Sequence, residues 1–385
     1  CSMSYNTDSG FNGRQLNNIY FEDITASYNT HSGGGGGICI SEKVSSSSDI
    51  TMIDVTAEHN GRDGILIWTW YDYCSISDVT ITGGLFTNNG WGGIRVLNWP
   101  ASGSTGGTIT NVNITEAQIE NNPNAGVWFE LGYGSSDATS SRVNYNNIQG
   151  NTNYGILNSG SGLLCGKCNW WGDGSGPSGV SSGIGDPVSN NVIYCPWLTD
   201  EYPYGDCIGG AICWNQQTGE YFCSIQAAID DPDTNDQTGD HDTIEIFAVT
   251  DIEQVNVYKS VTIYGQGIGN TIIQSPDVLT DYFTTSNNNY PIVYINNIDD
   301  VIIHNLTIDG AGKGNANYRF VGIGIYQAGA TVSNVEVIGV RDTPFSGAQH
   351  GVGIYGWSDG TGIAHNVVVK DCLVYDYQKT GIALG

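Results

Sequence analysis

The chain of 385 residues carries 12 basic and 39 acidic residues, which gives a formal charge of −27 at neutral pH. A charge of this sign and size repels nucleic acid, so a nucleic-acid partner is excluded. No apolar run reaches about 18 residues, so we expect no membrane-spanning helix in this segment. Gly supplies 54 residues, and Asn, Ser and Thr are abundant. This composition favours short β-strands joined by tight polar turns.

A two-residue motif, Gly followed by Ile or Val, recurs at nearly constant spacing. In the first half it stands at Gly37-Ile38, Gly64-Ile65, Gly93-Ile94, Gly126-Val127 and Gly155-Ile156, in steps of 27, 29, 33 and 29 residues. It returns at Gly324-Ile325, Gly353-Ile354 and Gly381-Ile382. Short alternating segments and polar turns precede the copies. A period near 30 residues with two-residue alternation is typical of a parallel β-helix, in which each repeat is one coil and its Ile and Val side chains point inward.

The segment 165–267 separates the two repeat regions. Within it, Ser224 can cap the N-terminus of a short helix whose Ile225, Ala228 and Ile229 share one face. The end of a β-helix exposes an unpaired strand edge, and an amphipathic helix is a suitable cover for such an edge. We therefore predict a capping helix at the start of the second repeat region.

Two sets of motifs around this segment resemble known β-helix proteins. The opening set is SIQAAID (224–230), TIEIF (243–247) and VNVYKSVTIYGQG (255–267), which resembles the start of right-handed parallel β-helix proteins of the pectate-lyase-like superfamily, including NosD-type and pectin-methylesterase-like domains. The closing set is CNWWGD (168–173), DPV (186–188) and PWL (196–198), which resembles the end of β-helix modules in bacterial and archaeal surface proteins. The resemblance implies the fold but no single activity, because the superfamily contains lyases, hydrolases, esterases, tailspikes and structural proteins.

These observations predict an all-β, right-handed parallel β-helix in two incomplete halves. Segment 1–200 is expected to be the C-terminal part of one module, 201–223 a Cys-rich connector, and 224–385 the capping helix and N-terminal part of a second module. The closing motifs precede the opening motifs, which suggests a window of tandem modules, or a protomer whose open ends stack on neighbours. The alternative is that the chain is simply part of one larger protein.

Aromatic and basic side chains occupy outward positions on several coils. The predicted outward set is Trp68, Trp70, Arg95, Trp99, Trp128, Tyr326, Tyr355 and Trp357. Exposed aromatic residues on adjacent coils form a flat ladder. Such a ladder serves as a side-by-side interface with another β-helix, as a surface covered by a loop, or as a platform for sugar rings, and the sequence leaves all three open.

No complete catalytic set is visible. If the chain is an enzyme of the superfamily, the best group is Asp309, Arg341, Asp342 and His350, and a smaller group is Glu58, His59, Arg62 and Asp63. With only 12 basic residues in the chain, ordinary ion pairs in turns are the simpler explanation of both groups. The acidic segment 230–242 is a candidate for Ca²⁺, although it lacks the EF-hand spacing, and no metal ligand is assigned.

The ten cysteines favour an exported protein in an oxidising compartment. The disulfide candidates are Cys165, Cys168, Cys195, Cys207, Cys213 and Cys223. We expect Cys165 or Cys168 to pair with Cys195 and the other three to supply a second bridge. Zinc is disfavoured, because Cys165, Cys168 and Cys195 lack a fourth ligand. Asn113 and Asn305 begin glycosylation sequons.

The sequence therefore predicts an extracellular structural protein, a module of a cell-surface filament, sheath or adhesin that assembles end to end with copies of itself. The alternatives are a secreted polysaccharide lyase or glycoside hydrolase, and a carbohydrate-binding adhesin without catalysis.

Overall fold

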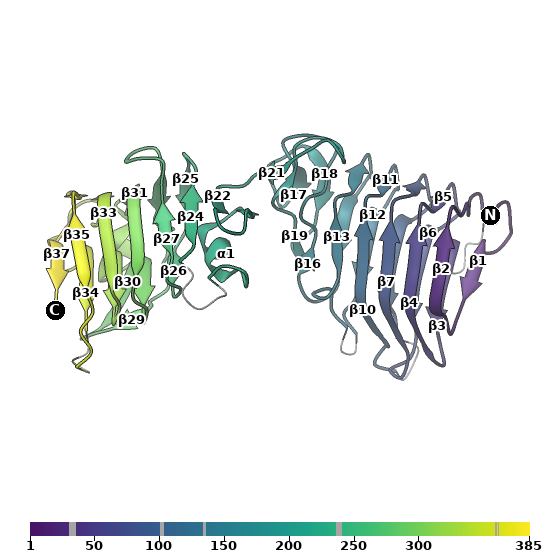
Figure 1. The fold of residues 1–385 in the computed structure, drawn as a ribbon, viewed down its shortest axis with the longest axis horizontal. Helices are drawn as coiled ribbons and strands as arrows, with labels where there is room; N and C mark the ends of the chain where they lie inside the picture. Colours follow the sequence, from purple (N-terminus) through teal and green to yellow (C-terminus); the bar gives the residue numbers. More distant parts are fainter. Residues whose placement is uncertain (31–35, 101–103, 134–135, 236–240, 359, 361) are drawn as a thin grey trace. The chain divides into compact units, whose positions relative to one another are not determined.

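The computed structural model describes residues 1–30, 36–100, 104–133, 136–235, 241–358, 360 and 362–385. The chain divides into two compact units, Cys1–Gly210 and Ala211–Gly385. Each unit is a solenoid of stacked parallel strands (Figure 1), so the predicted all-β parallel β-helix is confirmed. The segment 201–223, which we predicted to be a connector, lies partly in each unit.

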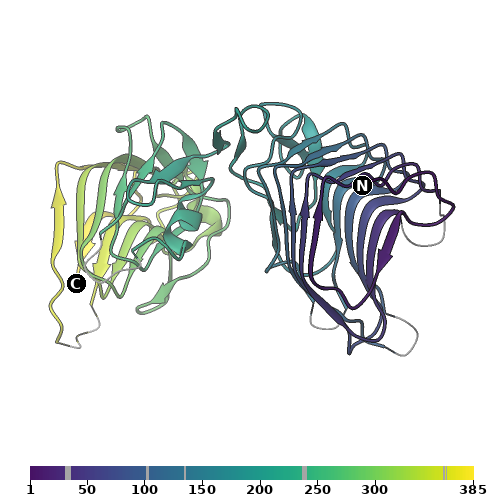
Figure 2. The same ribbon diagram turned by 45° about the vertical axis from the view of Figure 1, so that its right-hand side comes forward.

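Three sheets run along unit 1, and a full coil contributes one strand to each (Figure 2). The first sheet has the order β1 (Phe11–Gly13), β3 (Gly36–Glu42), β6 (Asp63–Thr69), β9 (Gly92–Asn98), β12 (Ala125–Glu130), β15 (Tyr154–Asn158), β18 (Gly185–Val188) and β17 (Pro177–Gly179). The second has β19 (Val192–Ile193), β16 (Leu164–Cys165), β13 (Arg142–Asn144), β10 (Thr108–Thr115), β7 (Ser75–Thr82), β4 (Ser46–Ile53) and β2 (Asn17–Glu22). The third has β14 (Asn147–Gln149), β11 (Gln118–Glu120), β8 (Leu85–Thr87) and β5 (Thr56–Glu58).

The core of unit 1 is a set of stacked inward columns. Ile38, Ile65, Ile94, Val127 and Ile156 are paired across five consecutive coils, and all are fully buried. This is the column that the Gly-Ile motif predicts. Because every coil repeats the same branched side chain at the same place, each pairs with a copy of itself above and below.

Each coil of unit 1 bends sharply where the sequence alone suggests one strand. The bends fall at Asp54, Gly83, Glu116 and Tyr145, all with left-handed backbone φ of 51° to 67°. They separate β4 from β5, β7 from β8, β10 from β11 and β13 from β14. Left-handed φ is uncommon outside Gly, Asn and Asp, so Glu and Tyr there are held by the packing of neighbouring coils.

A ladder of side-chain amides, buried from Asn29 to Asn151, runs through the turns that precede the strands of the first sheet. Its members are Asn6, Asn29, Asn60, Asn89, Asn122 and Asn151, ending at Asp186. The Oδ1 of Asn89 accepts from the backbone N and the Nδ2 of Asn60, at 3.2 and 3.0 Å. Its own Nδ2 donates to the carbonyl of Ala57 at 2.9 Å and to Oδ1 of Asn122 at 3.3 Å. One side chain per coil thus satisfies buried backbone groups that would otherwise lack partners.

The closing segment fills the end of unit 1. Trp171 is fully buried in the core, together with Val188 and Val192. The antiparallel pair β20 (Trp197–Leu198) and β21 (Cys207–Gly209) lies beyond it, and Trp197 packs against the core. The NWWG and PWL motifs therefore cover the end of the hydrophobic core of unit 1.

Unit 2 is built on two large sheets. The first has the order β23 (Tyr221–Phe222), β22 (Cys213–Asn215), β24 (Thr243–Ile246), β27 (Thr262–Tyr264), β31 (Val301–Asp309), β28 (Ile272–Gln274) and β25 (Thr250–Ile252), with β33 (Ala330–Ile338), β35 (Val367–Lys370) and β36 (Leu373–Val374) continuing from β31. The second has β26 (Val255–Val257), β30 (Asn288–Asn296), β32 (Phe320–Tyr326), β34 (Val352–Trp357) and β37 (Thr380–Leu384), and β29 (Phe283–Thr284) pairs with β30. A 3₁₀ turn spans Lys313–Ala316.

The predicted capping helix is present as α1 (Ile225–Asp230). The Oγ of Ser224 accepts from the backbone N of Ala227 at 3.0 Å, as an N-cap should. Ile225, Ala228 and Ile229 are fully buried in the core of unit 2. The hairpin β22–β23 covers the same end, because β22 pairs antiparallel with β24. No helix in the described part of the chain has the length and apolar character needed to cross a membrane.

In unit 2 the motif alignment is wrong by two residues between Gly324-Ile325 and Gly353-Ile354, but it is correct between Gly353-Ile354 and Gly381-Ile382. Ile354 pairs with Ile323 and Ile382, whereas Ile325 lies opposite Gly356, which in turn lies opposite Leu384. Tyr355 consequently lies opposite Gly324 and not opposite Tyr326. Positions two apart on a strand face the same way, so the motif alone does not distinguish them.

We predict that Asn89→Ala lowers the free energy of unfolding of unit 1 by about 2–4 kcal/mol, because it leaves several buried groups unpaired. The matched control is Asn88→Gly, at the neighbouring exposed position with a φ of 54°, which Gly adopts freely. Urea unfolding followed by circular dichroism measures both. Equal effects of the two substitutions would contradict a structural role for the ladder.

Candidate functional site

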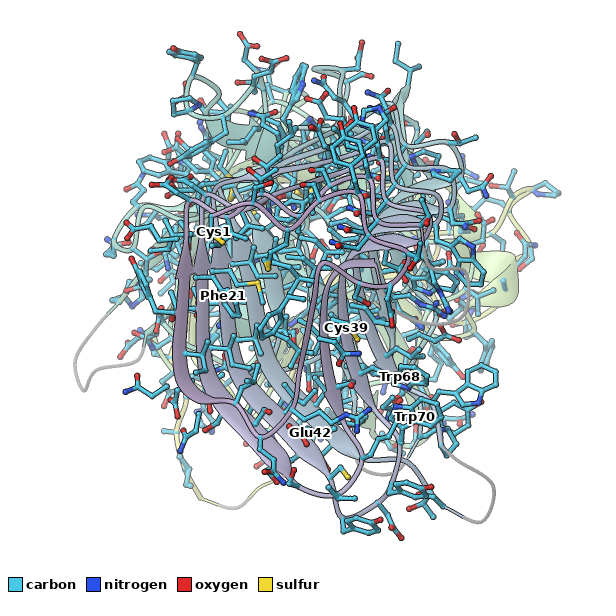
Figure 3. All side chains as sticks on the ribbon, turned by 90° about the vertical axis from the view of Figure 1, so that its right-hand side faces the viewer. Cys1, Phe21, Cys39, Glu42, Trp68 and Trp70 are labelled. Atoms are coloured by element: carbon cyan, nitrogen blue, oxygen red, sulfur yellow. A yellow bond between two sulfur atoms is a disulfide. The ribbon has the colours of Figure 1, made fainter. Side chains whose placement is uncertain are left out.

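The outer face of the first sheet in unit 1 carries the predicted tryptophans, but it is largely closed. Cys39, Leu66 and Leu97 form a small buried cluster there, with Trp68 packed against it. The ring centres of the stacked Trp68 and Trp70 lie 3.8 Å apart, and Lys43 Nζ lies 3.9 Å from the Trp70 ring centre. Both tryptophans are labelled in Figure 3. These two tryptophans therefore pack on each other and on the sheet, and they do not form a flat exposed surface.

Arg95 is a buried cation held between tryptophans of neighbouring coils. Its guanidinium lies 4.2 Å from the ring centre of Trp128 and 5.3 Å from that of Trp91. Its Nη2 donates to Oε2 of Glu130 at 2.6 Å, and its side chain is 5% exposed. Burial with a carboxylate partner and two aromatic faces indicates a structural role. Trp99 is more open, at 50% exposed.

In unit 2 a hairpin covers the predicted aromatic residues. Phe283, from β29, lies with its ring centre 5.4 Å from that of Tyr294, 5.3 Å from Tyr326 and 5.9 Å from Tyr355. It fits because Gly324 lies beneath it, where a Cβ would come within 3.0 Å of the ring. Of the three predicted uses of this ladder, cover by a loop is the arrangement seen around Tyr326 and Tyr355. Trp357 is 37% exposed.

The residues proposed for catalysis meet only in part. His350 Nε2 lies 3.2 Å from Oδ1 of Asp342, and both side chains are buried. Arg341 instead donates to Asp376 at 2.7 Å. In a separate turn, Asp309 accepts from the backbone N of Ala311 at 2.7 Å. The four side chains therefore do not form one catalytic set.

Asp342 is the centre of a network that holds the loop 342–350. Its carboxylate accepts hydrogen bonds from Ser346 Oγ and from Gln378 Nε2. Burial tends to raise the pKa of Asp342, but these hydrogen bonds and the proximity of His350 outweigh it, and the pKa lies below its ordinary value. An ionised carboxylate whose Oδ2 accepts these hydrogen bonds suits loop anchoring better than proton transfer.

The second predicted group, in the turn 58–63, is also divided. Asp63 is completely buried, with Arg62 Nε 3.6 Å from its Oδ2. Burial raises the pKa of Asp63 to about 6, against the opposing influence of Arg95 and Arg62. His59 points elsewhere and stacks on Tyr28 at 4.8 Å, and Tyr28 stacks on Tyr5 at 4.9 Å. This surface stack of rings was not predicted.

A buried acidic pair lies at the N-terminus of α1. Glu253 accepts hydrogen bonds from the backbone N of Ile225 at 2.8 Å and of Gln226 at 3.1 Å. Burial, together with the neighbouring carboxylate of Asp251, raises the pKa of Glu253 to about 7. Glu253 thus satisfies free helix N–H groups and titrates near neutral pH.

The cysteine pairing differs from our prediction. Cys168 is bonded to Cys207, and not to Cys195, across 39 residues of chain. Cys195 and Cys223 each take part in a disulfide as well. Cys165 and Cys213 are free thiols, which corrects their candidacy. Because Cys168 and Cys195 are oxidised, the three-thiol zinc arrangement is excluded.

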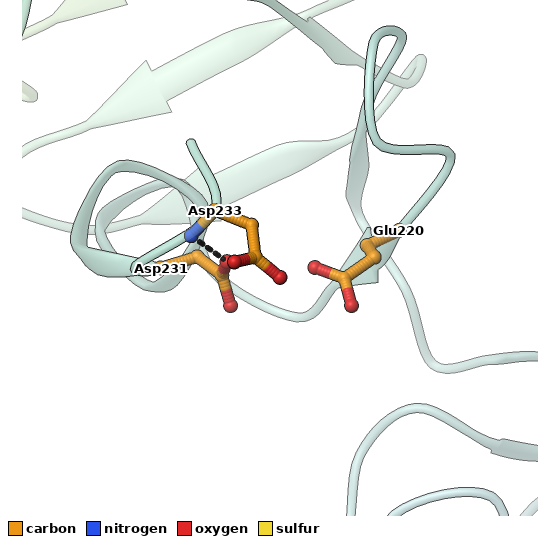
Figure 4. Close-up of side chains that lie close together, drawn as sticks. All are labelled: Glu220, Asp231 and Asp233. Carbon is orange, nitrogen blue, oxygen red and sulfur yellow. Dashed lines mark hydrogen bonds between the residues drawn. The ribbon is translucent and has the colours of Figure 1, made fainter. Parts of the chain in front are cut away.

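Part of the acidic segment gathers with one residue from outside it. Carboxylate oxygens of Glu220, Asp231 and Asp233 lie within 4.8 Å of one another (Figure 4). The backbone N of Asp233 donates to Oδ1 of Asp231 at 3.0 Å. Oxygen ligands of this kind suit Ca²⁺. The group is mostly exposed, and three acidic residues in a polar loop are also common without an ion. Residues 236–240 of the predicted segment lie outside the described part.

The two sequons lie on strands. Asn113 is in β10 and donates to Oδ1 of Asn111 at 2.8 Å. Asn305 is in β31 and donates to the carbonyl of Gly265 at 2.8 Å. Both side chains are half-buried, and glycosylation stays a prediction.

No protein-family model matches the chain, and neither the curated proteins nor the solved structures contain a match. The pectate-lyase-like assignment therefore still rests on the sequence motifs. Sequence reasoning missed the Asn ladder, although an Asn stands four residues before Gly64, Gly93, Gly126 and Gly155. That spacing was a usable signal.

We predict that the free energy of unfolding of unit 2 falls as the pH rises through the pKa of the Glu253 carboxyl group. The folded state binds this proton more tightly than the unfolded state, whose pKa is near 4.5, so the stabilisation is complete below about pH 4.5 and is lost by about pH 7. In Glu253→Gln the neutral amide can still donate a hydrogen bond to Asp251 but does not titrate. The loss of unfolding free energy between about pH 4.5 and pH 7 should therefore be smaller than in the unsubstituted protein. Unfolding midpoints in urea at several pH values measure it.

The control for this substitution is Asp300→Asn, which neutralises an exposed acid in the same unit at a left-handed φ that Asn tolerates. Its pH profile should follow that of the unsubstituted protein. A Glu253→Gln profile that matched the control would rule out Glu253 as the source of the pH dependence.

Removal of the covering ring should also be measurable. Phe283→Ala is expected to destabilise unit 2 by about 3 kcal/mol or more, because it opens a cavity above Gly324 and exposes Tyr294 and Tyr355. Phe345→Ala, at a ring that is 56% exposed, serves as the control with a small effect. A near-neutral Phe283→Ala would show that the hairpin does not close this face.

Proposed function

We propose that this chain is a structural protein whose outer coils accept further β-helix coils, either from tandem modules or from other copies. One observation carries the proposal. On the last coil of unit 2, Ile382 and Leu384 are 44% and 57% exposed. Ile382 and Leu384 lie opposite Ile354 and Gly356, in register with inward positions of the preceding coils. They are core side chains on which no further coil packs among the described residues.

The other end of the same unit supports this view by contrast. There α1 and the hairpin β22–β23 cover the first coil, and its apolar residues are buried. In unit 1 the Trp171 segment similarly fills one end, whereas Phe11 and Leu16 of the opposite end are only partly buried. Each solenoid therefore has one closed end and one end with partly uncovered core residues.

A strand edge adds hydrogen-bonding capacity to this apolar surface. An unpaired edge presents free backbone N–H and C=O groups, which form a template for another strand. Burying a Leu or Ile side chain stabilises an assembly by roughly 1.5–3 kcal/mol each. Edge pairing and side-chain burial would therefore act together.

Location outside the cytoplasm is part of the proposal. Disulfides persist in oxidising compartments and are rare in the cytosol. A filament, sheath or adhesin at the cell surface fits this chemistry. A polysaccharide lyase or hydrolase is less well supported, because Arg341 and Asp342 are committed to ion pairs and loop contacts.

The experiment is sedimentation velocity of the chain over roughly 1–500 µM. We expect concentration-dependent association, weakened at least about tenfold in Ile382→Lys/Leu384→Lys, because a charge at each core position opposes burial. Val278→Lys, at a loop residue that is 73% exposed, is the matched control and should associate normally. A monomer throughout this range, or equal association of all variants, would refute stacking through this edge.

A further inference from the structure

A small cavity of about 110 Å³ opens on the outer face of the second sheet of unit 2. Three basic residues line it, Arg319, His350 and Lys379, together with Asn289 and Tyr355. None of its lining residues is acidic. In a chain with 39 acidic and 12 basic residues, a concave site of this composition calls for an explanation.

The three basic residues are stacked by the solenoid itself. They lie 31 and 29 residues apart, which is one coil each. Arg319 and Lys379 immediately precede β32 and β37, and His350 stands two residues before β34. Because β32, β34 and β37 are neighbours in one sheet, the residues at their starts are brought to one side of the molecule.

Of the three basic residues, His350 faces the carboxylate of Asp342, whereas Arg319 and Lys379 have no carboxylate partner among the described residues. Arg319 donates to two hydroxyls, Ser286 Oγ at 2.7 Å and Thr285 Oγ1 at 3.3 Å, neither of which is charged. Lys379 has no side-chain partner among the described residues. Lys313 and Arg341, by comparison, each have a carboxylate partner within 2.9 Å.

His350 provides a second, independent observation, because one of its ring nitrogens lacks a hydrogen-bond partner. Its side chain is 3% exposed, and its Nε2 is positioned by Asp342. Its Nδ1 is buried and has no hydrogen-bond partner in the described part of the chain. A buried polar atom without a partner is unfavourable, so its presence in the wall of a cationic cavity points to a ligand.

We propose that this cavity binds an oxyanion group, a carboxylate or a sulfate, carried by a small solute or by a polymer side group. Arg presents a rigid fork of N–H donors that matches the oxygens of such groups, and Lys adds a mobile charge. The volume suffices, since a single water needs roughly 10–15 Å³. The hairpin hydroxyls of Ser286 and Thr285 hold the guanidinium in place. The lining residues Lys379, Thr380 and Ala383 belong to or adjoin β37, the strand that also carries Ile382 and Leu384 of the stacking edge.

The test is titration of the full chain with sodium acetate and with sodium sulfate at constant ionic strength, balanced with chloride. Isothermal calorimetry and the ¹⁵N resonances of His350 report binding. We expect saturable binding of at least one oxyanion with a dissociation constant on the order of 1 mM, as suits so small a ligand, and a shift of the His350 resonances. Tighter acetate binding would identify a carboxylate ligand, and tighter sulfate binding a sulfate ester.

Lys379→Gln should weaken binding about tenfold, since it removes one charge-assisted contact. Lys370→Gln removes an exposed lysine from the same coil but outside the cavity, and it should leave binding unchanged. The proposal is overturned if neither oxyanion saturates, or if both substitutions reduce binding equally, because the effect would then come from general surface charge.

Discussion

The buried amide ladder is the interaction on which unit 1 depends most. In each coil the turn between two strands contains buried backbone N–H and C=O groups that cannot form hydrogen bonds with water. Asn solves this because one amide carries both donors and an acceptor. Each ladder member receives hydrogen bonds from the coil on one side and donates to the coil on the other, as Asn60 does between Asn29 and Asn89. The ladder thereby sets both the spacing and the register of the coils.

The chemistry of the ladder also explains where it stops. Asp186 accepts from the backbone N of Asn151 at 2.9 Å and from its Nδ2 at 2.8 Å. A carboxylate accepts but has no N–H to pass on, so the series of amides ends there. Burial raises the pKa of Asp186 although the bonds from Asn151 oppose it. Asp186 of the DPV motif therefore ends the ladder of side-chain amides, at the same end of unit 1 that Trp171 fills.

Periodicity predicted the fold because inward packing repeats with the coil, but it could not place every residue within a coil. In unit 1 the Gly-Ile column is correct, since turns of nearly constant length keep it aligned. In unit 2, Gly324 leaves room for Phe283 and so has a different role from Gly353, which lies one coil on. A two-residue motif carries no information about which of two inward positions it occupies. The bends at Glu116 and Tyr145 were missed because their left-handed backbone is imposed by neighbouring coils and not by local sequence.

Functional chemistry was harder to predict than the fold, because a coil brings together residues that are about 30 positions apart. Asp342 and His350 meet because they flank one loop, so their contact is local. Arg341 is adjacent in sequence to Asp342 but pairs with Asp376, one coil further on. The basic cavity follows the same rule, since Arg319, His350 and Lys379 are each one period apart. In a solenoid, residues one period apart are better candidates for a shared site than residues in one turn.

The strong negative charge of the chain affects how two copies can approach each other. Like-charged surfaces repel, and the repulsion reaches about 8–10 Å at physiological ionic strength. Most acidic residues lie on turns and outer faces, so side-by-side contact of two solenoids would bring many of them together. The proposed contact at the coil edge would instead bury Ile382 and Leu384, which are exposed here. For the stacking that we propose, repulsion between acidic outer faces would oppose side-by-side contact, and salt would weaken this repulsion because it screens exposed charges.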